Sequence, residues 1–163
     1  MSSNFALFKK QLANSFAFRM FLFTKVPAAF FAGIKLEKLE MEEAAIGVSY
    51  KWFNTNPFRS VYFAVLLMAG EISTGILCMA HLYKIKPGVS MLLIQNESNF
   101  YKKATGKITF TCTDGTLINE AADKAIATGE ATTVRCRSIG KNEQQETVTE
   151  TYFTWSFKIR KKA

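Results

Sequence analysis

SVYFAVLLMAGEISTGILCMAHLY, residues 60–83, is an apolar run in which Glu71 carries the one formal charge. The run is long enough to cross a bilayer as a helix. However, an ionised carboxylate at mid-membrane would cost about 2–3 kcal/mol, and a single helix offers it no partner. We therefore expect a helix buried inside a folded domain and no integral membrane segment. Because the helix is apolar nearly all round, it must be covered on most sides.

The composition of the whole chain predicts one ordered domain with an anionic partner. The 163 residues are 48% apolar, include 15 Phe, and carry a net charge of +8, which excludes a disordered chain. Cys78, Cys112 and Cys136 are scattered without a CxxC pair, which excludes a disulfide scaffold and favours a reduced, cytoplasmic protein. The positive balance fits a nucleic acid, a membrane surface or a phosphorylated small molecule. Because Arg19 and Lys25 interrupt the early apolar stretch, no signal peptide is expected.

The chain before residue 33 has the periodicity of a helix. Apolar residues recur at spacings of three and four over residues 4–24, and Pro27 ends the pattern; they are Phe5, Phe8, Leu12, Phe16, Met20 and Phe23. We expect residues 1–32 to form a helical segment packed on the domain, which comprises residues 33–163. The alternative is a membrane-surface helix that carries Lys9, Lys10 and Arg19.

Strands are predicted on both sides of the buried helix. Two precede it, at residues 34–39 and 44–52, and four follow it, at residues 89–100, 107–113, 131–139 and 151–160. The strand at 89–100 is apolar on both faces at its start, so we expect it to be central in the sheet. A short helix is predicted at residues 117–128, ended by Gly129. The fold class is therefore α+β, with an antiparallel sheet curled around one long helix.

Two stretches of the sequence, together with this order of elements, resemble a known family. They are Asn56-Pro-Phe-Arg-Ser-Val-Tyr-Phe-Ala64, continuing to Met68-Ala-Gly-Glu71, and Phe100-Tyr-Lys-Lys-Ala-Thr-Gly106. With their spacing, residues 33–159 resemble the hotdog-fold thioesterase superfamily. Within it, the chain looks like a poorly characterised hotdog family, a domain of unknown function related to phenylacetate-type acyl-CoA thioesterases. Those thioesterases carry His-Gly-Gly where this chain has Tyr62, Phe63 and Ala64.

The resemblance implies an acyl-CoA thioesterase. Glu71 would serve as general base or nucleophile, and its structural alternative is a buried Glu satisfied by Thr74 or by backbone groups. Asn56 would orient the thioester carbonyl or the attacking water, or would instead cap the helix. The backbone N–H groups of Phe63 and Ala64 would form the oxyanion hole at the helix N-terminus, and the Tyr62 hydroxyl could add a donor.

The resemblance also places a set of lysines at the phosphate end of coenzyme A. Lys102, Lys103 and Lys107 would bind the phosphates, or would form an ordinary solvated strand edge. Coenzyme A enters as part of the substrate, and no separate cofactor is implied. A metal site is not expected, because one His, His81, and scattered Cys residues cannot build one.

Two classes of function remain after these steps. The first is thioester hydrolysis by a homodimer or dimer of dimers whose sheets pair, with the site at the interface between subunits. The second is a non-catalytic acyl-CoA or lipid-binding protein on the same scaffold. Nucleic-acid binding is not expected, because the chain lacks the exposed aromatic and basic strand motif of an RNA reader.

Overall fold

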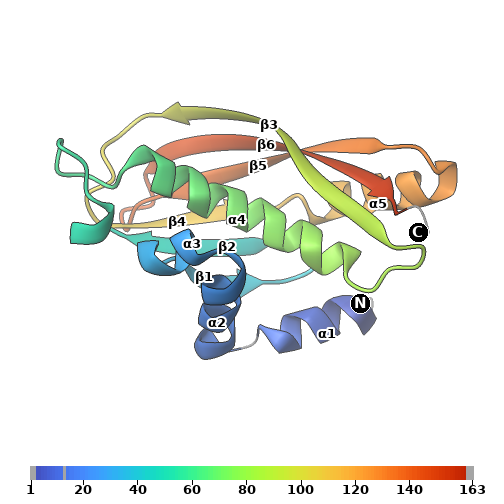
Figure 1. Ribbon diagram of the computed structural model, residues 1–163. Coiled ribbons are helices and arrows are strands. Elements are labelled where there is room, and N and C mark those ends of the chain that lie inside the picture. The colour runs from blue at the N-terminus through green and yellow to red at the C-terminus, as the bar shows by residue number, and fades with distance from the viewer. Residues whose placement is uncertain (1–2, 13, 161–163) are drawn as a thin grey trace.

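The structure is a computed structural model that describes residues 3–12 and 14–160. It has an α+β architecture in which one antiparallel sheet packs against a long central helix (Figure 1). The helices are α1 (Ser3–Gln11), α2 (Ser15–Lys25), α3 (Pro27–Ala32), the 3-10 turn η1 (Trp52–Asn54), α4 (Phe63–Leu82) and α5 (Gly115–Thr128). The strands are β1 (Lys35–Leu39), β2 (Ala44–Ser49), β3 (Val89–Phe100), β4 (Lys107–Cys112), β5 (Thr132–Lys141) and β6 (Thr147–Ile159).

The six strands lie in the order β1-β2-β4-β5-β6-β3, and every neighbouring pair is antiparallel. The predicted central position of β3 is wrong, because β3 is an edge strand that pairs with β6 alone within the described chain. Val89 is buried, and Met91 and Leu93 are partly buried against the core, whereas Leu92 and Ile94 are exposed. Although both faces of this strand are apolar at its start, only one of them is covered by the core.

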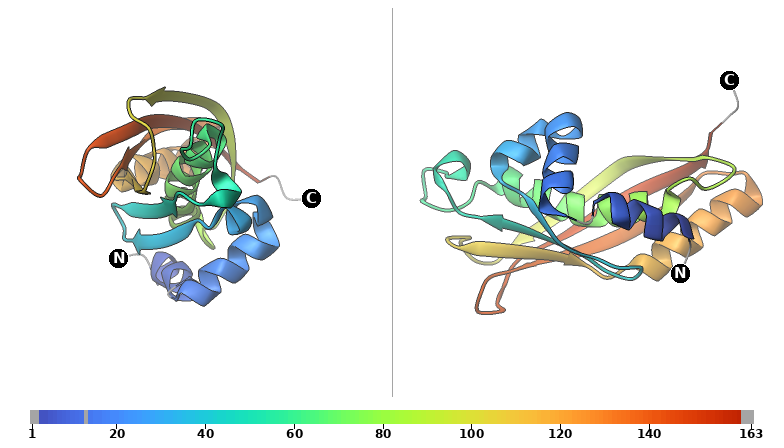
Figure 2. Two further views of the ribbon diagram at one scale, coloured as in Figure 1. Left: turned by 90° about the vertical axis from the view of Figure 1, so that its left-hand side faces the viewer. Right: turned by 90° about the horizontal axis from the view of Figure 1, so that it is seen from below.

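The central helix α4 is buried, as its sequence predicts. It packs on β2, β4, β5 and β6, and the sheet curls around it (Figure 2, left). α1 and α3 also contact α4, and α5 contacts it next to β5 and β6. Gly70 permits the close approach to the sheet, since a Cβ there would lie 2.8 Å from the Thr151 hydroxyl oxygen. Although α4 is long and apolar enough to cross a bilayer, 67% of that apolar window is buried in the domain.

The N-terminal segment differs from the single helix predicted for residues 4–24. It forms α1 and α2, and Asn14 begins α2 by accepting a hydrogen bond from the Ala17 N–H at 2.7 Å. This new start changes the helical phase. Phe5, Phe8 and Leu12 are buried as expected, but in α2 the buried residues are Phe18 and Leu22. Phe16, Met20 and Phe23 consequently face away from the core.

The chain also turns earlier than predicted between β2 and α4. The strand predicted to reach residue 52 ends at Ser49, and Trp52 lies in η1. Buried Asn54 causes the turn, because its side-chain Oδ1 accepts from the Lys51 N–H at 2.9 Å and its Nδ2 donates to the Ser49 carbonyl at 2.9 Å. The helix expected to begin near Ser60 begins at Phe63.

Candidate active site around the central helix

Glu71 lies in the middle of α4 and is half-buried. Its Oε1 lies 3.2 Å from the position of a Cβ built on Gly75, one turn later, and the Trp155 ring borders the same position. Among the described residues, no hydrogen bond or ion pair involves the Glu71 carboxylate. Burial raises the pKa of Glu71 to about 6. The carboxylate is therefore more basic than an exposed one, yet still mostly ionised at neutral pH.

Thr74 does not satisfy this carboxylate, contrary to the structural alternative. Its hydroxyl donates to the backbone carbonyl of Glu71 at 3.0 Å and accepts from the Trp155 indole N–H at 3.0 Å. Trp155 belongs to β6 and is paired with Leu93 of the edge strand β3. Glu71 therefore faces the β3–β6 side of the curled sheet. Trp155 was not among the predicted site residues, although its alternation with Phe153 and Phe157 indicates an inward side chain.

The N-terminus of α4 carries the expected backbone donors. The Tyr62 carbonyl accepts from the N–H groups of Val65 and Leu66, at 2.9 and 3.3 Å. Within the described chain, the N–H groups of Phe63 and Ala64 have no acceptor, as is usual in the first turn of a helix. The Tyr62 and Phe63 rings are exposed and meet edge to face, 4.9 Å apart. This helix end can therefore accept an anion or a polarised carbonyl oxygen.

Asn56 shapes the loop that leads to α4 and does not cap the helix. Its Oδ1 accepts from the N–H groups of Phe58 and Ser60 at 3.0 and 3.1 Å, and its Nδ2 donates to the Ser60 hydroxyl at 3.0 Å. The residue at the N-cap is Tyr62, which makes no side-chain capping bond. The predicted capping role of Asn56 is therefore wrong, and its amide is engaged within residues 56–61.

A cavity of about 350 Å³ lies beside the N-terminus of α4. It brings together Asn56 and Phe63 with two of the three predicted phosphate-binding lysines, Lys102 and Lys103. The third, Lys107, does not line it, because its Nζ pairs with Glu37 at 2.7 Å. Lys102 is itself paired with Glu146. The structure thus places a partly neutralised basic rim next to the free helix donors.

Within one chain, Glu71 lies about two helical turns after the N–H groups of Phe63 and Ala64. Ala64 and Glu71 lie seven residues apart on one helix, which corresponds to about 10 Å at 1.5 Å per residue. A thioester carbonyl bound by the N–H groups of Phe63 and Ala64 would therefore lie about two helical turns from Glu71 of the same chain.

The remaining chemistry-bearing residues have structural roles. Nε2 of His81 lies 2.8 Å from the Met41 carbonyl, and its ring packs against Phe5. The three cysteines are free thiols in the core. No group of three or more His, Cys, Asp or Glu side chains that could hold a metal occurs among the described residues.

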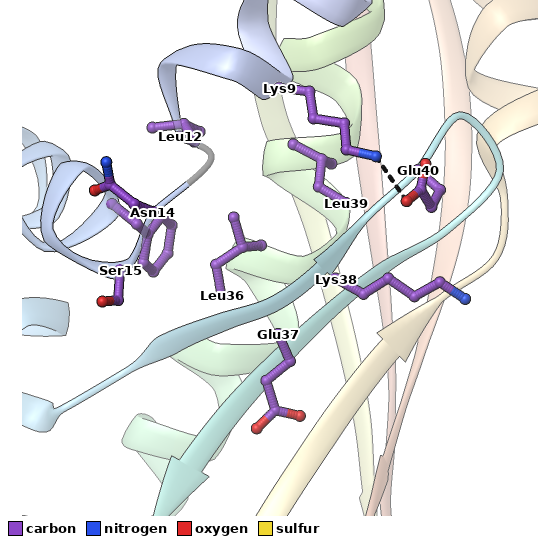
Figure 3. A pocket seen from close by; sticks show the side chains of 10 residues that line it. Lys9, Leu12, Asn14, Ser15, Leu36, Glu37, Lys38, Leu39 and Glu40 are labelled. Atoms are coloured by element: carbon purple, nitrogen blue, oxygen red, sulfur yellow. Dashed lines mark hydrogen bonds and ion pairs between the residues drawn. The ribbon is translucent and has the colours of Figure 1, made fainter.

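A second cavity, of about 260 Å³, lies between α1, α2 and β1 (Figure 3). Its charged groups are already paired. Lys9 meets Glu40 at 2.7 Å across the cavity, and Glu37 and Lys38 pair with Lys107 and Glu43. This neutral cavity adds no candidate for catalysis.

Comparison with known proteins identifies the fold. No protein-family model matches the sequence, and no curated protein matches it either. A solved structure of a Pseudomonas aeruginosa protein of unknown function, described as a probable thioesterase, has a TM-score of 0.75 at 18% identity over 90% of this chain and 97% of its own. A Chlorobaculum tepidum protein of unknown function has a TM-score of 0.72 at 11% identity over 87% and 92%. A thioesterase from Haemophilus influenzae has a TM-score of 0.65 at 12% identity over 90% and 91%.

Identities this low establish a shared architecture and nothing finer. The expected resemblance is confirmed at that level, since the neighbours include thioesterases and proteins of unknown function with the same arrangement of sheet and central helix. The chain has the hotdog fold.

Proposed function

We propose that this protein is an acyl-CoA thioesterase in which Glu71 is the general base or nucleophile. The observation that carries the proposal is the isolated Glu71 carboxylate, which has a pKa raised to about 6 and no partner among the described residues. A catalytic base is most effective when its pKa lies near the working pH. The shared fold with thioesterases supports the reaction class.

In the general-base form of the reaction, the Glu71 carboxylate takes a proton from water as the water oxygen attacks the thioester carbonyl. In the nucleophilic form, the carboxylate attacks first, and water then hydrolyses the resulting anhydride. In both forms the carbonyl oxygen gains negative charge, which the N–H groups of Phe63 and Ala64 would stabilise. The carbon–sulfur bond breaks, and the coenzyme A sulfur leaves as a thiolate that takes up a proton.

The site would be assembled from two chains. Because about 10 Å of helix separates Glu71 from the donors of its own chain, the donors would come from a second copy. The exposed edge of β3 offers the place for that copy, since Glu71 faces this side of the sheet and the strand carries exposed Leu92 and Ile94. A homodimer, or a dimer of such dimers, follows from this arrangement.

The coenzyme A part of the substrate would lie along the cavity at the start of α4. Lys102 and Lys103 line that cavity and would meet the phosphates as point charges. Lys107 is held by Glu37 and contributes less. Asn56 would act through the loop it shapes, and the exposed Tyr62 hydroxyl remains a further donor.

The test is hydrolysis of a panel of acyl-CoA thioesters by wild type and by Glu71→Gln. Because this substitution keeps the shape and removes the base, we expect a loss of about 100-fold or more in kcat/KM. Glu120→Gln, on an exposed face of α5, is the matched control and should hydrolyse the panel like wild type. Equal activity of Glu71→Gln and wild type would contradict the assignment.

A second candidate function is non-catalytic binding of acyl-CoA or lipid. It is favoured by the exposed Tyr62 and Phe63 rings at the helix N-terminus, which offer an apolar surface beside the cavity. Binding of acyl-CoA measured by calorimetry, together with no hydrolysis of any panel member by wild type, would select this candidate.

A further inference from the structure

A row of aromatic side chains lies on the part of the molecule formed by α2, α3 and η1, which occupies the lower left of Figure 1. The rings of Phe23, Phe30, Phe31 and Phe53 form a chain with successive centroid distances of 5.1, 5.3 and 6.2 Å. The neighbouring Trp52 is 88% exposed. We call these five residues the aromatic row. A group of exposed rings of this extent marks an interaction surface.

The outward face of α2 extends this surface. Phe16, Met20 and Phe23 are exposed and follow a spacing of four and three, so they lie on one side of the helix. Phe16 is 72% exposed. Because Phe23 belongs to both groups, the aromatic row and the α2 stripe form one apolar surface.

Three cations that form no ion pair in the described chain, Arg19, Lys35 and Lys51, lie within this apolar surface, and Lys51 Nζ donates to the Phe31 carbonyl at 2.8 Å. The Arg19 guanidinium lies 4.6 Å from the Phe30 ring centroid, and Lys51 Nζ lies 5.7 Å from that of Phe53. Burial, and then the positive charges of Arg19 and Lys35, lower the pKa of Lys51. The three cations are therefore close enough to repel one another.

No carboxylate compensates these charges. Every ion pair in the described part of the chain uses other cations. Residues 1–36 and 44–70, which supply the whole surface, contain no Asp or Glu. A cavity of about 300 Å³ between α2 and β1 places Arg19 and Lys35 beside Phe18 and Leu36. Its lining can hold an anionic group next to an apolar one.

We propose that this end of the molecule docks on an anionic lipid bilayer. The rings and the α2 stripe enter the interfacial region, and Arg19, Lys35 and Lys51 meet headgroup phosphates. An anionic bilayer satisfies both the apolar and the cationic groups of this surface. The inference does not depend on the thioester chemistry proposed above.

Two other occupants fit less well. A second copy related by two-fold symmetry would place these cations against the same cations. Single-stranded nucleic acid needs ring faces open for stacking. Here the rings pack against each other, with Phe30 at 65° to Phe23 and at 86° to Phe31.

Tryptophan fluorescence can report on this docking without an added label. It has two Trp residues, and Trp155 is 5% exposed, so a change in emission on adding vesicles reports on Trp52. With vesicles of phosphatidylcholine and phosphatidylglycerol, we expect a blue shift and co-sedimentation that high salt reverses. With phosphatidylcholine alone we expect neither. Absence of binding to the mixed vesicles would overturn the proposal.

Matched variants distinguish vesicle binding at this surface from attraction due to the net charge of the protein. Arg19→Glu with Lys35→Glu should weaken partitioning onto mixed vesicles by about 30-fold or more, since each lost cation accounts for about fivefold. Lys124→Glu with Lys141→Glu makes the same charge change on α5 and β5 and should have a much smaller effect. Trp52→Ser, which keeps every charge, should also weaken co-sedimentation.

The remaining outcomes each decide against the bilayer. An equal effect of both charge reversals would mean non-specific attraction. Concentration-dependent assembly that the Arg19→Glu/Lys35→Glu variant alone loses would mean that a second copy occupies the surface. Displacement from vesicles by an oligothymidylate would mean a nucleic-acid site. Hydrolysis of a short-chain acyl-CoA by the same variants, without vesicles, keeps this result separate from the proposed function.

Discussion

Glu71 couples the stability of the protein to pH. Its pKa rises from 4.5 to about 6 on folding because burial disfavours the charged form. Between these values the native state binds the proton more tightly than the unfolded state, so stability falls as pH rises through this window. Above pH 6 the full cost applies, at most about 2 kcal/mol. Glu71→Gln should therefore raise the free energy of unfolding in urea at pH 7 by up to that amount and change it little at pH 4.

The matched control for this prediction is again Glu120→Gln, because Glu120 is exposed on a helix. It should shift the free energy of unfolding by less than about 0.5 kcal/mol at both pH values. A Glu71→Gln variant that is less stable than wild type at pH 7 would mean that the carboxylate makes a favourable interaction as an anion.

At the scale of elements, the junction of α5 with the β1–β2 turn depends on a glycine. A Cβ on Gly115 would lie 2.1 Å from the Met41 carbonyl oxygen and 2.5 Å from the Glu42 Cα, both of which belong to the backbone. The Glu42 carboxylate also accepts from the Thr116 N–H at 2.8 Å. Because backbone cannot move aside as a side chain can, Gly115→Ala should lower the free energy of unfolding by about 1–3 kcal/mol in urea.

Gly129→Ala, at the other end of α5, provides the comparison. Gly129 has a φ of +74° and open space around it, so alanine there costs only the left-handed strain of about 1 kcal/mol. If Gly115→Ala costs less than Gly129→Ala, the turn and α5 are not in the close contact described here.

The elements that could be predicted from the sequence are those whose signal is local. α4 and Glu71 stand out because one charge interrupts a long apolar run, and the alternation of β6 marks its inward face. The phase of α2 could not be predicted, because it depends on Asn14 starting a new helix. The edge position of β3 depends on pairing with β6, which begins at Thr147, long after β3 ends at Phe100.

Only those parts of the candidate site that have a local sequence signal could be predicted. Glu71, Phe63 and Ala64 follow from their positions on one helix. The hydrogen bonds of Asn56 with Ser60 depend on the geometry of one loop, and the pairing of Lys107 with Glu37 depends on two strands that are far apart in the sequence. Sequence periodicity carries no information on loop geometry or on contacts between distant strands.

Over the whole molecule, the excess positive charge is not confined to the lysines predicted to bind phosphate. Lys102 and Lys107 were expected to bind phosphate, yet each is paired with a carboxylate. Arg19, Lys35 and Lys51, at the aromatic end, are among the cations that form no ion pair in the described part of the chain. The net charge of +8 therefore points to a surface that covers several elements in addition to a single lysine-rich loop.

The proposed site also makes a prediction about assembly. Leu92 and Ile94 are 66% and 52% exposed on the edge strand β3, and lysine on an edge strand opposes pairing with another chain. The Leu92→Lys/Ile94→Lys variant should sediment as a monomer where wild type sediments as a dimer or larger. Its acyl-CoA hydrolysis should fall toward that of Glu71→Gln although Glu71 is intact, because donors from the second copy are lost.

Leu117→Lys controls for the loss of an exposed apolar side chain, since Leu117 is half exposed on α5, away from β3. It should leave both the mass and the hydrolysis unchanged. A Leu92→Lys/Ile94→Lys monomer that hydrolyses at the wild-type rate would show that one chain completes the site. The donors facing Glu71 would then have to lie within that chain, contrary to the proposed two-chain site.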